Sequence, residues 1–234
     1  MLSRCFLITC TSPAYRPVGM PVNMIPNQPF RPQPAGGRDK LLEAAIRQIR
    51  LQGFSATSVD RLCGEAGVTK GAFFHHFASK EALGVAAARH WSQSTGQFFA
   101  AAPFHHHPRA VDRVLGYIDL RIALISGPPE SFSCVAGTML QESFHTSDAI
   151  RLACEASIMG NAAALLPDIA EAMRDCGVTG IEPESLARQI QAVIQGAFVI
   201  AKSQDEAAAA QTARETLQHL RRYFELLFNV GGED

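Results

Sequence analysis

Residues 69–77 read TKGAFFHHF and combine three phenylalanines with one lysine and two histidines. The lysine and the histidines supply hydrogen-bond donors that suit phosphate groups or the base edges of a nucleic acid. The phenylalanines instead need burial or an apolar partner. A helix meets both needs when one face anchors it in a core and the other face contacts the partner. Phe73 and Phe77 are four residues apart, so they predict the anchoring face.

The opposite face of this helix is predicted to carry Lys70, Gly71, Ala72, Phe74 and His75. Lys70 can donate to guanine acceptors or to phosphate. The small side chains at positions 71 and 72 let the backbone approach base edges closely. Thr69 and the free N–H groups at the helix start favour a phosphate oxygen. Lys80, just beyond the turn FAS, is placed to donate to a further phosphate.

The preceding residues predict the rest of a helix-turn-helix. Apolar positions within residues 42–49 recur with helical spacing, and we expect Asp39 to cap this helix and Gly53 to end it. Thr57 and Asp60 form a T-x-x-D pattern that predicts the cap of a second, short helix. The turn EAGVT then leads to the helix described above, which is the one that enters the major groove in such motifs.

These residues also carry a resemblance. The stretch LLEAAIRQIRLQGFSATSVDRLCGEAGVTKGAFFHHFASKEAL, residues 41–83, resembles the DNA-binding domain of the tetracycline-repressor (TetR) family of bacterial regulators. The resemblance implies an all-helical homodimer with a C-terminal ligand-responsive domain, usually a repressor that leaves its operator when a small molecule binds. By position it also implies a set of DNA contacts: Thr57, Thr69, Lys70, His75, His76 and Lys80.

One position departs from the family's pattern. Members commonly have tyrosine where this chain has Phe74. A phenyl ring can pack against the DNA backbone or a thymine methyl, but it cannot donate to a phosphate. We therefore expect slightly weaker binding or an altered base preference at this position.

The distribution of charge agrees with a partner at one end of the chain. Residues 1–90 carry eleven Lys or Arg and five Asp or Glu, whereas the complete chain has a net charge of −1. A basic first part joined to an acidic second part suggests a polyanion partner for the first part only. Residues 1–37 contain seven of the thirteen prolines and no acidic residue, which predicts a disordered tail.

Helical patterns fill the remainder, so we predict an all-α protein with three segments: the tail 1–37, a helix-turn-helix domain 38–84, and a helical effector-binding and dimerisation domain 85–230. After a helix from Ser79 to about residue 102, we expect further helices near residues 109–126, 134–145, 148–175, 183–203 and 206–228. Pro167 should kink or divide the third of these. The last two are strongly apolar and, by the resemblance, form the homodimer interface.

Candidate residues for the effector pocket are less sharply indicated. Apolar side chains with a few polar anchors are typical of such pockets, and the residues we select are Tyr117, Arg121, Cys134, Met139, Glu142 and His145. Cys134 is expected near a helix N-terminus, where a thiolate is favoured. An alternative function is therefore a redox- or electrophile-sensing repressor that uses Cys134. A small buried cysteine is the simpler interpretation.

Other classes of protein receive little support. The chain shows no nucleophile–base–orienter set, no paired carboxylates and no glycine-rich phosphate loop, so a Cys- or His-dependent enzyme is a remote alternative and no catalytic residue or cofactor is expected. His75 and His76 are adjacent on a helix and would chelate a metal poorly. The run FHHHP at residues 104–108 is expected to be an exposed connector. The sequence has no uninterrupted apolar span of about 20 residues, the length that crosses a membrane, and no C-x-x-C pair. We therefore expect a cytoplasmic protein without a membrane partner.

Overall fold

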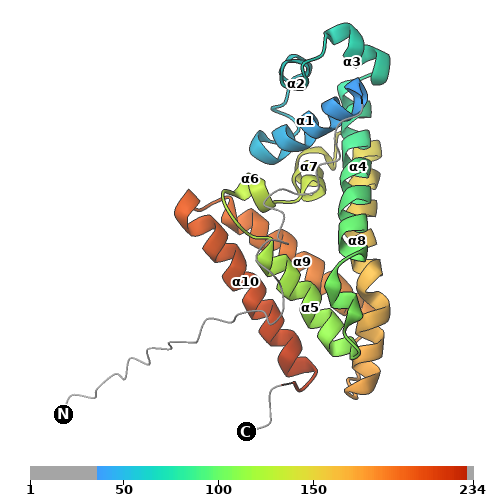
Figure 1. Ribbon diagram of the computed structural model, residues 1–234, viewed down its shortest axis with the longest axis vertical. Helices are drawn as coiled ribbons and strands as arrows, with labels where there is room; N and C mark the ends of the chain where they lie inside the picture. The colour runs from blue at the N-terminus through green and yellow to red at the C-terminus, as the bar shows by residue number, and fades with distance from the viewer. Residues whose placement is uncertain (1–35, 231–234) are drawn as a thin grey trace, which may run out of the picture.

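The structure is a computed structural model that describes residues 36–230, and within that range all regular elements are helices (Figure 1). The predicted all-α fold class is therefore confirmed. The predicted proline-rich tail, residues 1–37, lies outside the described residues except for Gly36 and Gly37. Gly37 is the first residue of α1, and Gly36 occupies the cap position. The prediction that Asp39 caps this helix is thus wrong, because Asp39 lies within its first turn.

Three short helices form an N-terminal unit at one end of the molecule (Figure 1). They are α1 (Gly37–Gln52), α2 (Val59–Ala66) and α3 (Lys70–His76). Each contributes to a shared core, whose fully buried side chains include Leu42, Leu62 and Phe73. Between α2 and α3, Gly67 has a left-handed backbone conformation with φ of 64°, which glycine adopts without steric cost. The predicted helix-turn-helix is confirmed.

Side-chain caps set where these helices begin. Thr69 and Ser79 each accept a hydrogen bond from the backbone N–H three residues later, which confirms both predicted caps. The predicted cap at Thr57 is wrong, because Ser58 caps α2 instead. The Thr57 hydroxyl is occupied elsewhere, since it donates to the carbonyl oxygen of Gly53 at 2.7 Å. This bond closes the loop between α1 and α2.

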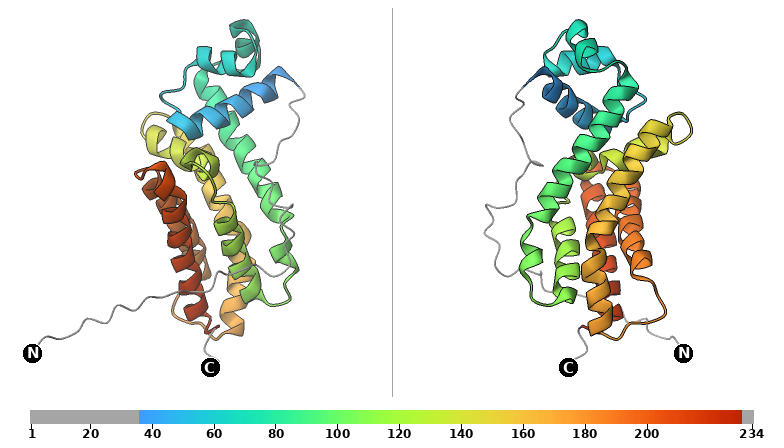
Figure 2. Two further views of the ribbon diagram at one scale, coloured as in Figure 1. Left: turned by 60° about the vertical axis from the view of Figure 1, so that its left-hand side comes forward. Right: turned by 90° about the vertical axis from the view of Figure 1, so that its right-hand side faces the viewer.

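A long helix, α4 (Lys80–Ala100), leads from the N-terminal unit into a larger C-terminal unit (Figure 2). The main helices of that unit are α5 (Ala110–Ala123), α7 (Val135–Ser143), α8 (Asp148–Asp175), α9 (Pro183–Ala201) and α10 (Glu206–Leu227). Helix α8 packs against α4, α5, α7 and α9, and α10 packs against α5 and α9. The helices predicted in this half are all present, with ends shifted by a few residues.

Prolines account for the differences from prediction. The 3-10 helix η2 (Pro103–His106) and the single-turn helix α6 (Pro129–Phe132) lie in segments expected to be loops. Each starts with a proline, whose missing N–H costs no hydrogen bond in a first turn. Pro167 does not divide α8, which is one helix on both sides of it.

The core of the N-terminal unit continues into the C-terminal unit through α7. Val135, Ala136 and Met139 are completely buried and belong to the same hydrophobic cluster as Phe73. A second cluster lies among the helices of the C-terminal unit. Cys134, at the start of α7, packs against both clusters. A displacement of α7 would therefore change the packing of both hydrophobic clusters.

Among the described residues, α8 is the one helix that is long and apolar enough to cross a membrane by length and composition. The core helix of a folded domain meets the same criterion. Helix α8 packs against four other helices of this chain, and 33% of its apolar window is buried in these contacts.

Candidate nucleic-acid interface and internal cavity

Helix α3 lies at the end of the molecule, in the part of the N-terminal unit farthest from the C-terminal helices (Figure 1). Its anchoring face is as predicted, because Phe73 and Phe77 are buried. The residues exposed along its other side are Thr69, Lys70, Gly71, Phe74 and His75. Ala72 is half-buried between the two faces. The exposed side chains form a short surface on the outer side of α3.

Lys70 is held by a carboxylate in the free protein. Its Nζ lies 2.7 Å from Oδ1 of Asp60 on α2, and both side chains are well exposed. The hydrogen bond to Asp60 raises the pKa of Lys70, so the amine is charged. Exposed ion pairs are weak, and a phosphate or guanine acceptor can therefore replace Asp60 as the partner of this amine.

Phe74 is a large apolar side chain that is exposed to solvent. It is 56% exposed, and its ring meets the ring of Phe73 edge to face with centroids 5.1 Å apart. The contact with Phe73 fixes the orientation of the ring at the tip of the exposed surface. An apolar group held in this way is suited to a thymine methyl or a sugar face.

The remaining predicted DNA contacts lie off this surface. Thr57 is buried under the loop that follows α1. His76 is half-buried, with Nε2 close to Gly37 at the start of α1. Lys80 donates to the carbonyl oxygen of Ser55 at 3.0 Å, and burial lowers the pKa of its amine. All three make contacts within the N-terminal unit, and their predicted contacts with DNA stay a prediction.

A polar junction joins the two units. The backbone N–H of Ser55 donates to Oε2 of Glu142 on α7 at 2.8 Å. The amine of Lys80 donates to the carbonyl oxygen of Ser55. It also lies over the ring of Phe54, 4.7 Å from the ring centroid. Glu81 and Ser147 form a second bond across the junction. Glu142, selected from the sequence as a pocket anchor, thus holds the α1–α2 loop against α7.

The C-terminal unit encloses a cavity of about 30 Å³ where α4, α5, α8 and α9 meet the α6–α7 segment. Its aromatic walls are Trp91, Phe132 and Phe198. Its neutral polar side chains are Thr95, Asn161, Gln191 and Gln195. Arg121 and Cys134 complete the lining. A wider depression of about 540 Å³ between α4 and α8 is lined mainly by small side chains and is less enclosed.

The predicted pocket residues are partly brought together. Arg121 and Cys134 line the cavity, and Tyr117 is bonded to it through Arg121 Nε at 2.9 Å and Gln191 Nε2 at 3.2 Å. Met139 is instead part of the core that α7 shares with the N-terminal unit. His145 is exposed beyond the end of α7. Of the set selected from sequence, three residues are at or bonded to the cavity, Met139 and Glu142 are on the side of α7 that meets the N-terminal unit, and His145 belongs to neither group.

Several cavity residues were not selected from the sequence. Gln191 and Gln195 are four apart on α9, and Trp91 and Thr95 are four apart on α4. Polar residues spaced along one apolar face are a detectable signal of an internal polar site. That spacing is present in α9, but Arg188 and Gln189 on the same helix are polar and exposed, so the sequence alone does not single out the two glutamines.

The thiols of the described residues differ in environment. Cys63, Cys154 and Cys176 have a raised pKa because burial disfavours the thiolate, and that of Cys154 is about 12. Cys134 is half-buried, caps α7, and its Sγ accepts from the N–H of Gly137 at 3.4 Å. Its predicted place at a helix N-terminus is confirmed, while its role as a sensor stays a prediction.

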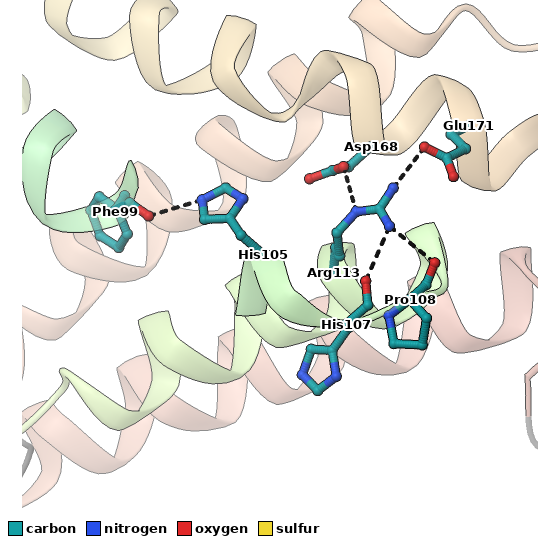
Figure 3. A network of polar contacts seen from close by, with 7 residues as sticks. All are labelled: Phe99, His105, His107, Pro108, Arg113, Asp168 and Glu171. Carbon is teal, nitrogen blue, oxygen red and sulfur yellow. Dashed lines mark hydrogen bonds and ion pairs between the residues drawn. The ribbon is translucent and has the colours of Figure 1, made fainter. Parts of the chain in front are cut away.

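The histidine run at residues 105–107 lies beside an ion-pair network (Figure 3). Arg113 pairs with Asp168 at 2.7 Å and with Glu171 at 2.6 Å, and it donates to the carbonyl oxygens of His107 and Pro108. Hydrogen bonding to Asp168 raises the pKa of Arg113. Across residues 36–230, no three His, Cys, Asp or Glu side chains are grouped as metal ligands.

The N-terminal unit has an exposed two-turn helix after a glycine turn, and it is joined to a helical second unit with an internal cavity. These features define a helix-turn-helix protein. Residues 41–87 match the family described as "Bacterial regulatory proteins, tetR family". This match confirms the resemblance predicted for residues 41–83.

Curated relatives are similar over the same segment. The HTH-type transcriptional repressor KstR2 of Mycolicibacterium smegmatis is 40% identical over 60 residues, which are 26% of this chain and 28% of the relative. The uncharacterized HTH-type transcriptional regulator YerO of Bacillus subtilis is 37% identical over 54 residues, 23% of this chain and 19% of the relative. The matches thus span less than a third of the length of these relatives.

Solved structures extend the likeness to both units. E. coli NemR in its reduced form has a TM-score of 0.68 and 24% identity, with 80% of this chain and 95% of NemR covered. A TetR-family regulator from Agrobacterium tumefaciens has a TM-score of 0.67 and 19% identity, with 80% and 98% covered. At this identity the likeness shows a shared fold, an N-terminal helix-turn-helix with a helical C-terminal domain.

Proposed function

We propose that this protein is a DNA-binding transcriptional regulator, most simply a repressor, whose affinity for its operator is controlled by a small effector. The exposed face of α3 is the observation that carries the proposal. It presents Lys70, Gly71, Phe74 and His75 on a helix that is fixed from behind by Phe73. A helix of this size fits the major groove, and its small residues allow close approach to base edges.

The regulator would act as a homodimer. Four large apolar side chains are exposed on the last two helices: Val199, Ile200, Tyr223 and Leu226. A second copy of the same surface would bury them in an isologous interface. A dimer places two α3 helices on one DNA molecule, which suits a palindromic operator in the cytoplasm of a bacterium.

Coupling between effector and DNA would pass through the walls of the cavity. Trp91 lines the cavity and also lies under the guanidinium of Arg50, the last-turn arginine of α1, at 5.2 Å. Arg50 is buried, which lowers its pKa to about 10. A ligand that moves Trp91 would therefore move the end of α1 and change the spacing of the two α3 helices.

The alternative of a thiol-sensing repressor that uses Cys134 has less support. The similarity of this chain to reduced NemR is a likeness of fold alone and does not support a sensing cysteine. Brief iodoacetamide treatment of the folded protein, followed by mass spectrometry, addresses the alternative. Alkylation of Cys134 before the other thiols, with loss of operator binding that Cys134→Ser prevents, would support it.

A mobility-shift titration tests the main proposal. The purified chain is titrated against labelled DNA from upstream of its own gene, with unrelated DNA of equal length as competitor, at about 0.15 M salt. We expect a retarded complex that the unrelated DNA displaces at least about a thousand times less well. Equal competition by both DNAs would contradict a sequence-specific regulator.

A further inference from the structure

Arg121 is a cation in a cavity that contains no acid. The residues that line the cavity include no Asp or Glu. Among residues 36–230, Arg121 forms no ion pair, whereas Arg113 pairs with two carboxylates. A guanidinium within an aromatic and amide-lined site loses part of its hydration. An anionic ligand would compensate for that loss.

The guanidinium of Arg121 is held in one orientation. Its Nε donates to the Tyr117 hydroxyl at 2.9 Å, and its central carbon Cζ lies 4.0 Å from the ring centroid of Phe99 and 5.1 Å from that of Tyr117. Its two terminal nitrogens have no acceptor among the described residues. They are therefore available as a pair of parallel donors, the arrangement that binds a carboxylate through both oxygens.

Tyr117 does not itself line the cavity, but its hydroxyl is bonded to two residues that do and has a further proton to donate. Its hydroxyl oxygen accepts from Arg121 Nε and from Gln191 Nε2, the latter at 3.2 Å. A hydroxyl that accepts two hydrogen bonds still has one O–H to donate, and no described residue accepts it. The side chain of Tyr117 is buried, so this proton needs a partner inside the protein.

The shape and lining of the cavity limit the rest of the ligand. A cavity of about 30 Å³ has room for about two or three water molecules, hence for a carboxylate with a short carbon chain. Trp91, Phe132 and Phe198 form apolar walls for that chain. Since Arg121 is the one charged residue of the lining, a single negative charge matches it.

We infer that the cavity binds a small monocarboxylate, with Arg121 and Tyr117 as the groups that recognise the carboxylate. The inference rests on the proposed function, because it names the chemical class of the effector. It goes further in assigning the recognition to two residues of α5. The amides of Gln191 and Gln195 then orient the bound group without adding charge.

Trp91 makes the test direct, because it is the one tryptophan of the chain and lines the cavity. Its fluorescence is followed while the DNA-free protein is titrated with sodium propionate, and separately with propionamide, at constant ionic strength. Isothermal titration calorimetry is run in parallel. Propionate should bind saturably, and propionamide, which has nearly the same shape but no charge, should bind at least about tenfold more weakly.

Variants locate the site. Arg121→Gln should lower propionate affinity about tenfold or more, to that of the amide, whereas Arg121→Lys should retain part of the preference. Tyr117→Phe should lower it severalfold. The matched control is Arg89→Gln, an exposed arginine on α4 outside the cavity, which should bind propionate as the unchanged protein does. Circular dichroism establishes that each variant is folded.

The outcomes separate the two proposals. Equal affinity for propionate and propionamide, or no fluorescence change and no heat with propionate, overturns the inference with the unaltered protein alone. If the operator is bound and propionate is not, the regulator stands and the ligand class is wrong. If propionate is bound with the expected preference but no specific DNA is, the site stands and the regulatory function fails.

Discussion

At the scale of single residues, the exposed face of α3 combines two kinds of group. Lys70 is a mobile charge that already has a partner in Asp60, at 2.7 Å. Phe74 is an apolar ring held in place by Phe73. Binding to DNA would require the first to exchange partners and the second to lose contact with water. The two residues therefore make different and separable predictions.

Lys70→Ala should weaken operator binding by roughly 1–3 kcal/mol and leave the fold intact, since the side chain is exposed and makes no core contact. Fluorescence anisotropy with labelled operator measures the effect. Asp60→Asn is the opposing control, because it frees Lys70 and removes a negative charge near the DNA, and it should bind somewhat more tightly. Unchanged affinity in Lys70→Ala at about 0.15 M salt would remove Lys70 from the contact surface.

Phe74→Tyr should strengthen operator binding by about 0.5–1.5 kcal/mol, because the added hydroxyl can donate to a phosphate while the ring keeps its contact with Phe73. The same anisotropy titration detects it. Phe74→Leu keeps an apolar side chain without the ring and should bind more weakly than the unchanged chain. If the tyrosine variant also binds more weakly, the ring meets an apolar part of the DNA where a hydroxyl is not tolerated.

At the scale of helices, the sequence allowed the order and type of the main elements to be predicted, because helical periodicity and caps such as Thr69 and Ser79 are local signals. The assignment of Thr57 failed because its hydroxyl is used within the loop that precedes α2. Its hydroxyl bonds to Gly53, which depends on the path of the loop. Proline-rich segments also misled, since α6 forms a single turn that length and propensity would not favour.

The cavity was harder to predict for a related reason. Its lining residues come from helices that are far apart in the sequence. Glu142 and Gln195 are both polar residues on helices, and their sequence neighbours do not show which of them faces a cavity. Only packing decides that Gln195 faces the cavity while Glu142 accepts from Ser55 at the junction. Arg121 could be selected because a cation on an amphipathic helix is a local feature. Its lack of a carboxylate partner is a tertiary fact.

The network around Arg113 connects the loop after η2, α5 and α8 (Figure 3) and yields a prediction about stability. Arg113 is 14% exposed and Glu171 is 44% exposed. Arg113→Met should lower the free energy of unfolding by about 2–4 kcal/mol, because it leaves Asp168 without its partner. Thermal denaturation followed by circular dichroism should show a lower midpoint. Glu171→Gln should cost less than about 1 kcal/mol, and equal losses in both variants would contradict this account.

At the scale of the whole molecule, the two units are coupled by packing and by polar contacts. Helix α7 is in the core that it shares with the N-terminal unit, and Cys134 at its start lines the cavity. Trp91 connects the cavity to Arg50. A change at the cavity thus has two contiguous physical routes to α1. Such a change alters DNA binding only if the spacing of two α3 helices must match the spacing of two half-sites on the DNA. The proposed regulation therefore requires a dimer.

Leu226→Glu should convert the dimer to a monomer, because Leu226 is 65% exposed on α10 and a carboxylate there would be buried against a second copy. Light scattering after size exclusion should give a mass near 25.3 kDa instead of twice that value. Operator affinity should fall by orders of magnitude, because each α3 then binds its half-site alone. Leu51→Glu, at a residue 53% exposed on α1, is the matched control and should remain dimeric. A dimer that survives Leu226→Glu with unchanged operator affinity would place the interface elsewhere on the molecule.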